Sequence, residues 1–268
     1  MLLSEGNHSI IPTFILLGFS EYPELRVPLF LVFLSIYTVT VVGNLGMIII
    51  TKVNSKLHTV IYFFLSHLSF VDFCFSTVVT PKLLENLIAE DRTISFSGCI
   101  VQFCFTCLFG VAETFMLAAM AYARFVARCA LLVAGSYSWG VMCSVTLTYF
   151  LLALSYCKSS TLNNFICDHS VIVSVSCSDP YITQMLCSII AIFNEASSLV
   201  IILMSYMFIF ITVMGIPSAS GRWKTFSTCA SHLTAISIFH GNILFLFCIP
   251  NPKTSWLTVK VTSVFYTV

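Results

Sequence analysis

Charge is the scarcest property of this sequence. Aspartate, glutamate, lysine and arginine make up 9% of its 268 residues, against 58% hydrophobic residues and a mean hydropathy of +0.99. An ordinary soluble domain carries about 25% charged residues, so this chain has too little polar surface to cover a water-soluble globule of its size. The sequence therefore predicts an integral membrane protein, with membrane lipid as its surrounding partner.

Further absences exclude whole classes of function. The net charge is +1, and neither a basic tract nor a glycine-rich phosphate loop occurs, so nucleic acid is not an expected partner. No HExxH, GxSxG or comparable pattern occurs, so an enzyme is not expected. The amino terminus lacks the charged start and cleavage site of a signal peptide, so the first long apolar run is expected to direct insertion.

Long apolar runs dominate the chain. About 20 apolar residues cross a bilayer as a helix, which satisfies its own backbone hydrogen bonds. A last run, 257–268, would reach roughly 18 Å at 1.5 Å per residue, short of the ~30 Å hydrocarbon core. The sequence predicts an all-α polytopic bundle in one domain, 1–268, with six complete spans and a truncated seventh. The complete spans are expected at 27–51, 61–80, 99–122, 129–157, 181–214 and 225–250.

The distribution of basic residues favours one orientation. With the amino-terminal segment, 1–26, outside the cell, the loops at 52–60, 122–130 and 214–224 face the cytoplasm, and all their charged residues are basic. Basic residues in short loops beside helix ends are typical of the inner face. Asn7 begins an Asn-His-Ser glycosylation acceptor, which this orientation places on the lumenal side.

Two carboxylates stand inside the expected spans. A charge at mid-membrane costs at least ~2.5–3.5 kcal/mol on insertion scales, so it normally faces the bundle interior with a partner. Asp72 and Glu113 both fall near mid-depth on neighbouring antiparallel spans and could converge. Such a pair suggests a sodium ion or a shared proton. The alternative is a protonated carboxyl group that hydrogen-bonds to Ser69, Ser76 or Thr114.

Four of the twelve cysteines fall on the expected outer side. They are Cys99, Cys157, Cys167 and Cys177, and the compartment is one in which disulfides persist. Four cysteines allow three pairings, so spacing does not give the connectivity. Free buried thiols are the alternative. The adjacent residues at 167–169, Cys-Asp-His, make a poor zinc pattern, so no metal site is expected.

Several motifs together resemble the vertebrate olfactory receptors, a group of rhodopsin-like G-protein-coupled receptors. They are "LHTVIYFFLSHLSFVDFC" (57–74), "MAYARFVARC" (120–129), "SYMFIFITVMGIPSASGRWKTFSTCASHL" (205–233), "FHG" (239–241) and "SVFYTV" (263–268). The resemblance implies a seven-helix receptor that binds small apolar odorants and signals through a stimulatory olfactory-type, heterotrimeric G protein. It also implies the plasma membrane as location, with retention in the endoplasmic reticulum as the alternative for a shortened chain.

The resemblance assigns roles to individual residues. It implies the disulfides Cys99–Cys167 and Cys157–Cys177, and it supports an ion site at the paired carboxylates of Asp72 and Glu113. The odorant contacts that it implies are Thr106, Cys107, Gly110, Val111, Asn194, His240 and Ile243. For each of these positions the alternative is ordinary helix packing. For His240 that alternative is a core histidine whose hydrogen bonds are satisfied within the protein.

Two departures from the family pattern bear on signalling. Ala123 replaces the acid that precedes Arg124, so the ion pair that restrains the family's cytoplasmic end cannot form here. Arg124 is therefore expected either to serve G-protein coupling without that restraint or to act as an inner-face anchor. The family's second intracellular loop also has no counterpart after Arg128. The missing loop, together with the truncated seventh helix, predicts impaired coupling, whereas the lost ion pair predicts raised basal activity where the rest of the coupling machinery is present.

Two other functions compete with the receptor. A transporter would use Asp72, Glu113 and Glu195 as a cation or proton path, but neither an internal repeat nor paired broken helices are present. A non-signalling receptor fragment is the other alternative. Glu195 itself is expected either to line the pocket or to lie in the outer third of its helix.

Overall fold

A computed structural model of the chain describes residues 13–16, 23–54, 59–89, 93–122, 129–156, 161–162, 164, 166–215 and 218–248. The predictions for Asn7, Arg124, Cys157 and the partial seventh helix fall outside these residues. The long helices are α1 (Arg26–Val53), α2 (Val60–Ile88), α3 (Phe96–Tyr122), α4 (Cys129–Leu152), α6 (Tyr181–Met214) and α7 (Ala219–Cys248). The short elements are η1 (Pro23–Leu25), α5 (His169–Ser174), β1 (Thr13–Leu16), β2 (Thr93–Ser95) and β3 (Thr161–Leu162).

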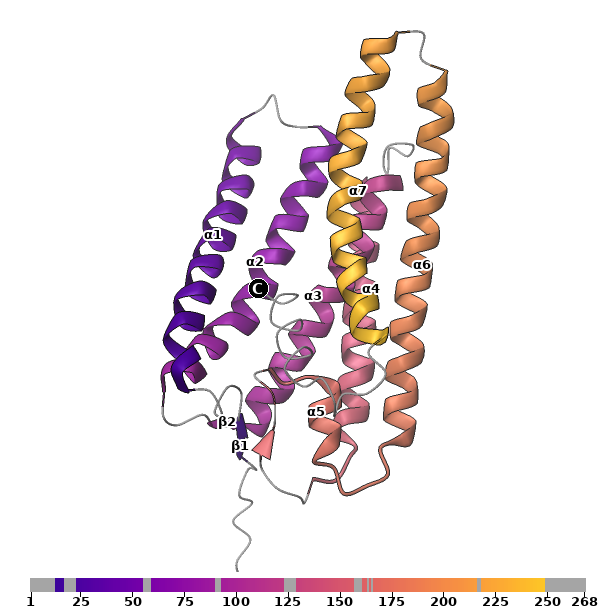
Figure 1. Cartoon of the computed structure of the whole chain (residues 1–268). Helices are drawn as coiled ribbons and strands as arrows, with labels where there is room; N and C mark the ends of the chain where they lie inside the picture. The colour runs from indigo at the N-terminus through magenta and orange to yellow at the C-terminus, as the bar shows by residue number, and fades with distance from the viewer. Residues whose placement is uncertain are drawn as a thin grey trace, which may run out of the picture.

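The long helices form an antiparallel bundle around α3 (Figure 1). Helix α3 packs against α2, α4 and α6, α1 packs on α2, and α7 packs on α6. The strands and α5 gather at one end of the bundle, the strand end (Figure 1). At the opposite end, α6 and α7 project beyond the other helices.

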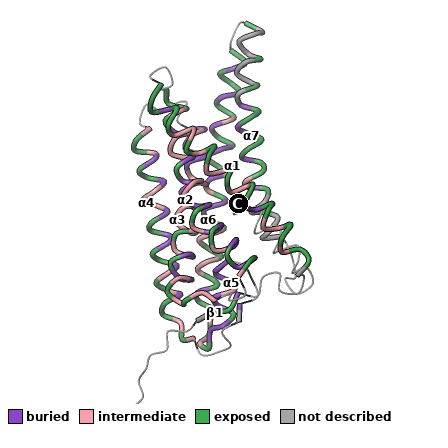
Figure 2. The backbone as a smooth tube through the Cα atoms, turned by 90° about the vertical axis from the view of Figure 1, so that its left-hand side faces the viewer, coloured by how far each residue is buried: buried purple, intermediate pink, exposed green. Residues whose placement is uncertain are grey.

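Apolar side chains cover the outside of this bundle. Within the described residues, α1, α2, α3, α4 and α6 are long and apolar enough to cross a membrane, and only 6% of the most apolar part of α1 is buried inside the protein. Figure 2 shows exposed residues recurring along the outward side of the long helices. Val39, Tyr149 and Leu203 are among them, each about two thirds exposed or more. Such a surface requires lipid as its solvent, so the chain is a multi-pass membrane protein.

Helix α2 differs from its predicted extent. It runs through Pro81 to Ile88, where the apolar pattern predicted an end at Thr80. The extra turns carry an ion pair between Lys82 and Glu85, with 2.9 Å between Nζ and Oε2. Apolar runs mark only the lipid-embedded part of a helix, and pairs three residues apart stabilise its continuation into water.

Helices α4 and α7 also differ from their predicted extents. Helix α4 ends at Leu152, before the predicted end at Cys157, because the Ala153 and Leu154 amides donate to α4 carbonyls in a tight final turn. The Tyr156 hydroxyl donates to the Leu151 carbonyl at 2.7 Å. Helix α7 begins at Ala219, before the predicted Thr225, in a polar stretch that hydropathy does not mark.

The strand end carries a small sheet that the sequence did not predict. Strand β1 lies in its middle, antiparallel to β2 and parallel to β3. Phe14 and Leu16 of β1 are buried against Cys99, Leu151 and other residues of α3 and α4. The three strands, α5 and the segment that carries Cys167 form one unit, called the cap below.

A second group of buried residues joins α3, α6 and α7 at a level of the bundle farther from the cap. Leu117 and Ala118 of α3 contact Ile202 of α6 and Ile236 of α7. These four residues are called the central cluster. Since each is an aliphatic side chain at most 4% exposed, the cluster brings α3, α6 and α7 together by apolar packing.

Helices α3 and α4 approach most closely at Gly140. A Cβ atom added to Gly140 would lie 2.7 Å from the Leu108 carbonyl oxygen and 3.5 Å from the Ala112 Cβ. The near atom belongs to the backbone, so relief requires a helix to move. The absence of a side chain at Gly140 therefore sets the spacing of these two helices.

We expect Gly140→Ala to destabilise the protein by about 1–3 kcal/mol through overpacking. Thermal unfolding of the detergent-solubilised protein measures this. Gly135→Ala on the same helix is the matched control, because no atom lies within 4 Å of its added Cβ. The control is expected to be neutral or to gain up to about 1 kcal/mol from helix propensity. Equal behaviour of the two variants would contradict the close approach.

Candidate functional site

A disulfide fixes the cap to α3. Cys99 in the first turn of α3 is bonded to Cys167, with 5.3 Å between their Cα atoms, and both residues are buried. This is the pairing that the family resemblance implied. Cross-linking residues 68 apart in the sequence restricts the unfolded chain, a contribution of about 2–4 kcal/mol.

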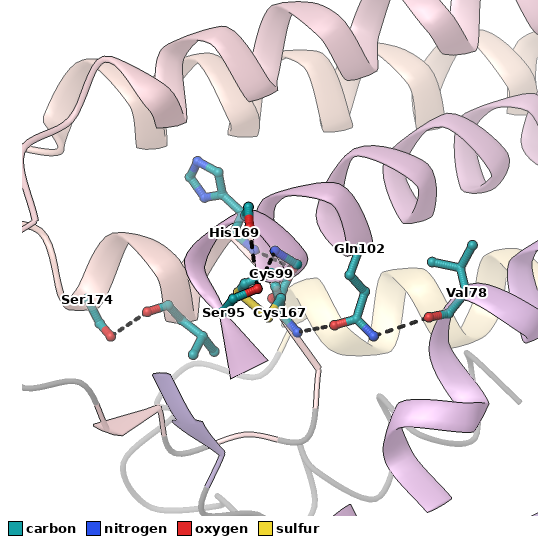
Figure 3. Close-up of a disulfide and its surroundings, with 11 residues drawn as sticks. Val78, Ser95, Cys99, Gln102, Cys167, His169 and Ser174 are labelled. Atoms are coloured by element: carbon teal, nitrogen blue, oxygen red, sulfur yellow. Dashed lines mark hydrogen bonds between the residues drawn. A yellow bond between two sulfur atoms is a disulfide. The ribbon is translucent and has the colours of Figure 1, made fainter. Parts of the chain in front are cut away.

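Gln102 reinforces this attachment, one turn further along α3. Its Oε1 accepts a hydrogen bond from the Cys167 amide at 3.2 Å, and its Nε2 donates to the Val78 carbonyl of α2 at 3.3 Å. Figure 3 shows Gln102 between these two partners, beside the disulfide. One buried side chain thus joins the cap, α3 and α2.

Cys177 is also disulfide-bonded. Its amide donates to the Ser155 carbonyl at 2.8 Å, and Tyr156 pairs with Ser176 as an isolated bridge. These contacts hold the chain around Cys177 against the residues that follow α4. The pairing of Cys177 with Cys157 stays a prediction.

Helix α5 is the part of the cap that packs against α6. Asp168 precedes it, and one carboxylate oxygen accepts from the His169 amide at 2.8 Å. The His169 ring is buried, with its centroid 6.2 Å from the ring of Phe103 on α3. Burial lowers the pKa of His169 and the Asp168 carboxylate opposes this more weakly, while Nε2 is buried and has no partner among the described residues.

The α3 candidates differ in their surroundings. The Thr106 hydroxyl oxygen is buried and has no hydrogen-bond partner in the part of the chain that the structure describes. Cys107 lies within electrostatic reach of two thiols on other helices, Cys143 and Cys187. Gly110 and Val111 follow at intermediate exposure. Thr106 therefore has a buried oxygen that a ligand can bond to.

Asn194 on α6 is held by α4. Its Oδ1 accepts a hydrogen bond from Trp139 Nε1 at 2.8 Å, and its side chain also contacts the Cys143 thiol. Asn194 is buried. Of the two roles open at this position, the geometry favours helix packing over odorant contact.

Glu195 and His240 form a buried pair that sequence reasoning did not join. Glu195 Oε2 lies 2.7 Å from His240 Nδ1, and the two side chains are 11% and 3% exposed. The contact links α6 to α7, while His240 Nε2 is buried without a partner among the described atoms. The sequence does mark both residues, since each is an isolated polar residue in an apolar run. That two residues 45 positions apart are in contact is known only from the folded structure.

These candidates lie between the cap and the central cluster. At 1.5 Å rise per residue, Thr106 and Gly110 are two to three turns nearer the strand end than Leu117. Glu195 is about two turns nearer that end than Ile202, and His240 is one turn nearer than Ile236. Ile243 lies about one further turn along α7. The helices α3, α6 and α7 therefore present their polar candidates to one level of the bundle.

Asp72 and Glu113 meet at the interface of α2 and α3. Asp72 lies close enough to Glu113 to act on it electrostatically, and Asp72 Oδ1 is buried with no partner among the described residues. The hydroxyls of Ser76 and Thr114 donate to backbone carbonyls of their own helices, at 2.8 and 2.9 Å. These hydroxyls therefore do not donate to the carboxylates.

The described residues contain no group of three His, Cys, Asp or Glu side chains arranged to hold a metal ion. Oxygen donors from Asp72 and Glu113 are the type that hard cations prefer. Two carboxylates with one orphaned oxygen fit a monovalent cation better than a transition metal, which favours nitrogen and sulfur ligands.

Comparisons with known proteins agree with this arrangement. A family model described as "Olfactory receptor" matches residues 33–254. Olfactory receptor 5D13 of Homo sapiens is 73% identical, with 100% of this chain and 90% of the relative covered. Olfactory receptor 1165 of Mus musculus is 59% identical, with 100% and 89% covered. Squid rhodopsin has a TM-score of 0.66 at 17% identity, covering 95% of this chain and 80% of that structure, and supports the fold alone.

The alignment with olfactory receptor 5D13 runs over 282 positions, whereas this chain has 268 residues. Because the whole chain is covered, the relative holds residues within the alignment that have no counterpart here. In the structure, α3 ends at Tyr122 and α4 begins at Cys129.

We expect the stability of the solubilised protein to fall as the pH drops below about 6.5, the ordinary pKa of histidine. The folded-state pKa of His169 is lowered, so the unfolded chain binds the proton more readily and gains free energy in acid. Thermal unfolding between about pH 7.5 and 5 should give a smaller loss in His169→Phe. Ser174→Ala, an exposed position on the same helix, should keep the full loss. An unchanged slope in His169→Phe would contradict this assignment.

Proposed function

The chain belongs to the olfactory receptor family, whose members are odorant-detecting G-protein-coupled receptors, and from this premise we propose where this chain binds its odorant. A small, mostly apolar odorant binds between α3, α6 and α7, beneath the cap and above the central cluster. The observation that carries this proposal is the presence of two buried polar atoms at this level, Thr106 Oγ1 and His240 Nε2, that have no hydrogen-bond partner among the described residues. A buried polar atom without a partner costs about 1–3 kcal/mol, and a polar odorant group that bonds to it removes that cost.

The pair with Glu195 prepares His240 for this role. A carboxylate that accepts from Nδ1 fixes the ring orientation and leaves Nε2 as the atom that meets the ligand. Gly110 leaves space for the ligand, and Cys107, Val111 and Ile243 supply an apolar wall. Few polar groups in an apolar enclosure are typical of small-molecule sites. Asn194 acts indirectly, by holding α6 against α4.

The cap supports an orientation for the receptor. Disulfides persist in oxidising compartments, so the strand end, with Cys99–Cys167, faces the cell exterior or the lumen. We infer that the amino terminus is extracellular, that Asn7 carries glycan and that the mature protein resides in the plasma membrane. The second outer disulfide in this proposal joins Cys157 and Cys177.

Signalling in this proposal runs through Arg124 to a stimulatory olfactory-type G protein. Ala123 removes the acidic partner, which raises basal activity where coupling is intact. The internal residues that relatives have and this chain lacks fall, in our proposal, in the second intracellular loop between α3 and α4. Coupling is therefore impaired, and a non-signalling fragment is the limiting case. Nothing specific to this chain favours a transporter.

A sodium ion between Asp72 and Glu113 is the proposed modulator. The two carboxylates approach each other inside the bundle, and Asp72 Oδ1 has no partner in the described part of the chain, so this oxygen is available to coordinate a cation. A cation there would relieve the repulsion of two buried charges.

The receptor proposal is tested by cyclic-AMP reporting in cells. The chain as it stands is compared with one into which the second intracellular loop of olfactory receptor 5D13 is inserted after Arg128. We expect the restored chain to respond to some members of an odorant panel and the shorter chain to respond weakly or not at all. If the restored chain reaches the cell surface and still responds to no member of a broad odorant panel, the receptor proposal is wrong.

In the restored chain, Thr106→Val is expected to lower the potency of odorants with a polar group roughly fivefold to tenfold. The reason is the loss of one hydrogen bond in a buried site. Thr146→Val is the matched control, because Thr146 is exposed on α4 and donates to its own helix at Met142. Unchanged potency in Thr106→Val, with the receptor still responsive, would remove Thr106 from the site while leaving the receptor function intact.

For the ion site, replacing choline chloride by sodium chloride at equal ionic strength is expected to raise the unfolding temperature. Asp72→Asn should abolish this difference because it removes one carboxylate from the pair. Glu24→Gln, at an exposed position outside the bundle, should retain it. An equal sodium effect in all three proteins would refute the site.

A further inference from the structure

A cavity of about 610 Å³ lies far from the odorant site, at the end of the bundle opposite the cap. Its wall comes from the end of α1, the start of α2 and the start of α4. This volume is within the range of sites that bind small molecules. The described residues that line it are Thr51, Lys52, Thr59, Val60, Tyr62, Phe63, Ser66, His67, Cys129 and Ala130.

The polar groups of this wall are suited to an anion. Lys52 in the last turn of α1 forms no ion pair with any described residue, and it is close enough to His67 to act on it electrostatically. The hydroxyls of Thr59, Tyr62 and Ser66 form no hydrogen bond with the described part of the chain. None of the lining residues is acidic. An unpaired ammonium with three unused hydroxyl groups can hold a phosphate.

Backbone groups add to this preference. Helix α2 begins at Val60, and Thr59 before it makes no side-chain capping bond; α4 begins at Cys129. Both starts line the cavity. The first N–H groups of a helix carry a partial positive charge and have no partner within the helix. The start of α2 and Lys52 therefore both favour a negatively charged ligand in this cavity.

We propose that this cavity binds the phosphate of an anionic phospholipid from the inner leaflet. In the orientation proposed above, the cavity opens at the cytoplasmic membrane surface, where anionic lipids are concentrated. Val60 and Phe63 line it and are 43% and 39% exposed, so apolar surface lies beside the polar groups of the wall. A phospholipid matches both features, a charged head and an apolar tail, whereas free phosphate matches only the first.

Only the assignment of the lipid to the inner leaflet rests on the orientation proposed above. Lipid retention through Lys52 is measurable whichever way the chain is inserted. A failure of the receptor proposal and a failure of the lipid site are therefore distinguishable.

The test measures lipid bound to the full chain. The protein is reconstituted in nanodiscs of phosphatidylcholine alone or with a minority of phosphatidylserine, released gently, and its retained phospholipid is identified by native mass spectrometry. We expect selective retention of phosphatidylserine and a higher unfolding temperature in the discs that contain it. Lys52→Gln should lower the apparent affinity about fivefold, the effect of one basic residue at an anionic surface, and Lys52→Arg should restore it.

Lys82→Gln is the matched control, because Lys82 lies at the strand end of α2 and is paired with Glu85. It should retain phosphatidylserine like the unsubstituted chain. Equal loss in the Lys52 and Lys82 variants would indicate a general charge effect and overturn the site. Retention of phosphatidylcholine without selectivity, or an equal thermal shift with inorganic phosphate in place of anionic lipid, would also overturn the proposal.

Discussion

The bond between Cys99 and Cys167 is the constraint on which the rest of the structure depends. It fixes the cap to the first turn of α3, the helix that packs against α2, α4 and α6. Gln102 carries the same constraint to α2 through the Val78 carbonyl. Because the cap is anchored to the central helix, the side chains below it on α3 have a fixed position relative to the strands and α5.

Polar groups inside the bundle are of two kinds: those with a hydrogen-bond partner in the protein, and those without one among the described residues. The hydroxyls of Ser76 and Thr114 bond to their own helices, and Asn194 bonds to Trp139, so these groups stabilise the fold. Thr106 and His240 each keep a buried atom without a partner in the described residues. Inside a membrane no water is available to form a hydrogen bond with such a group, and a bound ligand is the simplest source of the missing hydrogen bond.

The sequence predicted the fold class because apolar length is a direct consequence of bilayer thickness. It predicted the ends of α2 and α7 less well, since a helix that continues into water through Lys82 and Glu85 leaves no apolar signal. The strands of the cap were missed because each has at most four residues and pairs with a distant segment.

Contacts between distant segments also limited how much of the site the sequence could predict. The candidates on α3 and α7 were found from the family pattern, and Glu195 and His240 were each noticed as isolated polar residues. Their contact was not predictable, because it depends on the rotation of two helices about their axes. Asn194 illustrates the converse: the family resemblance implied a ligand contact, while the neighbouring α4 supplies Trp139 as its partner.

The two histidines of α7 determine how this helix is attached to α6. His240 contacts Glu195, and His232 lies 2.5 Å from the Tyr206 hydroxyl, so the two hydrogen bonds stand roughly 12 Å apart along the helix axis. Two attachment points along α7 set its direction relative to α6, and moving one of them tilts the helix about the other. An odorant that shifts His240 would therefore tilt α7 about His232, and the end of the helix beyond His232 would move the opposite way by an amount that grows with its distance from His232.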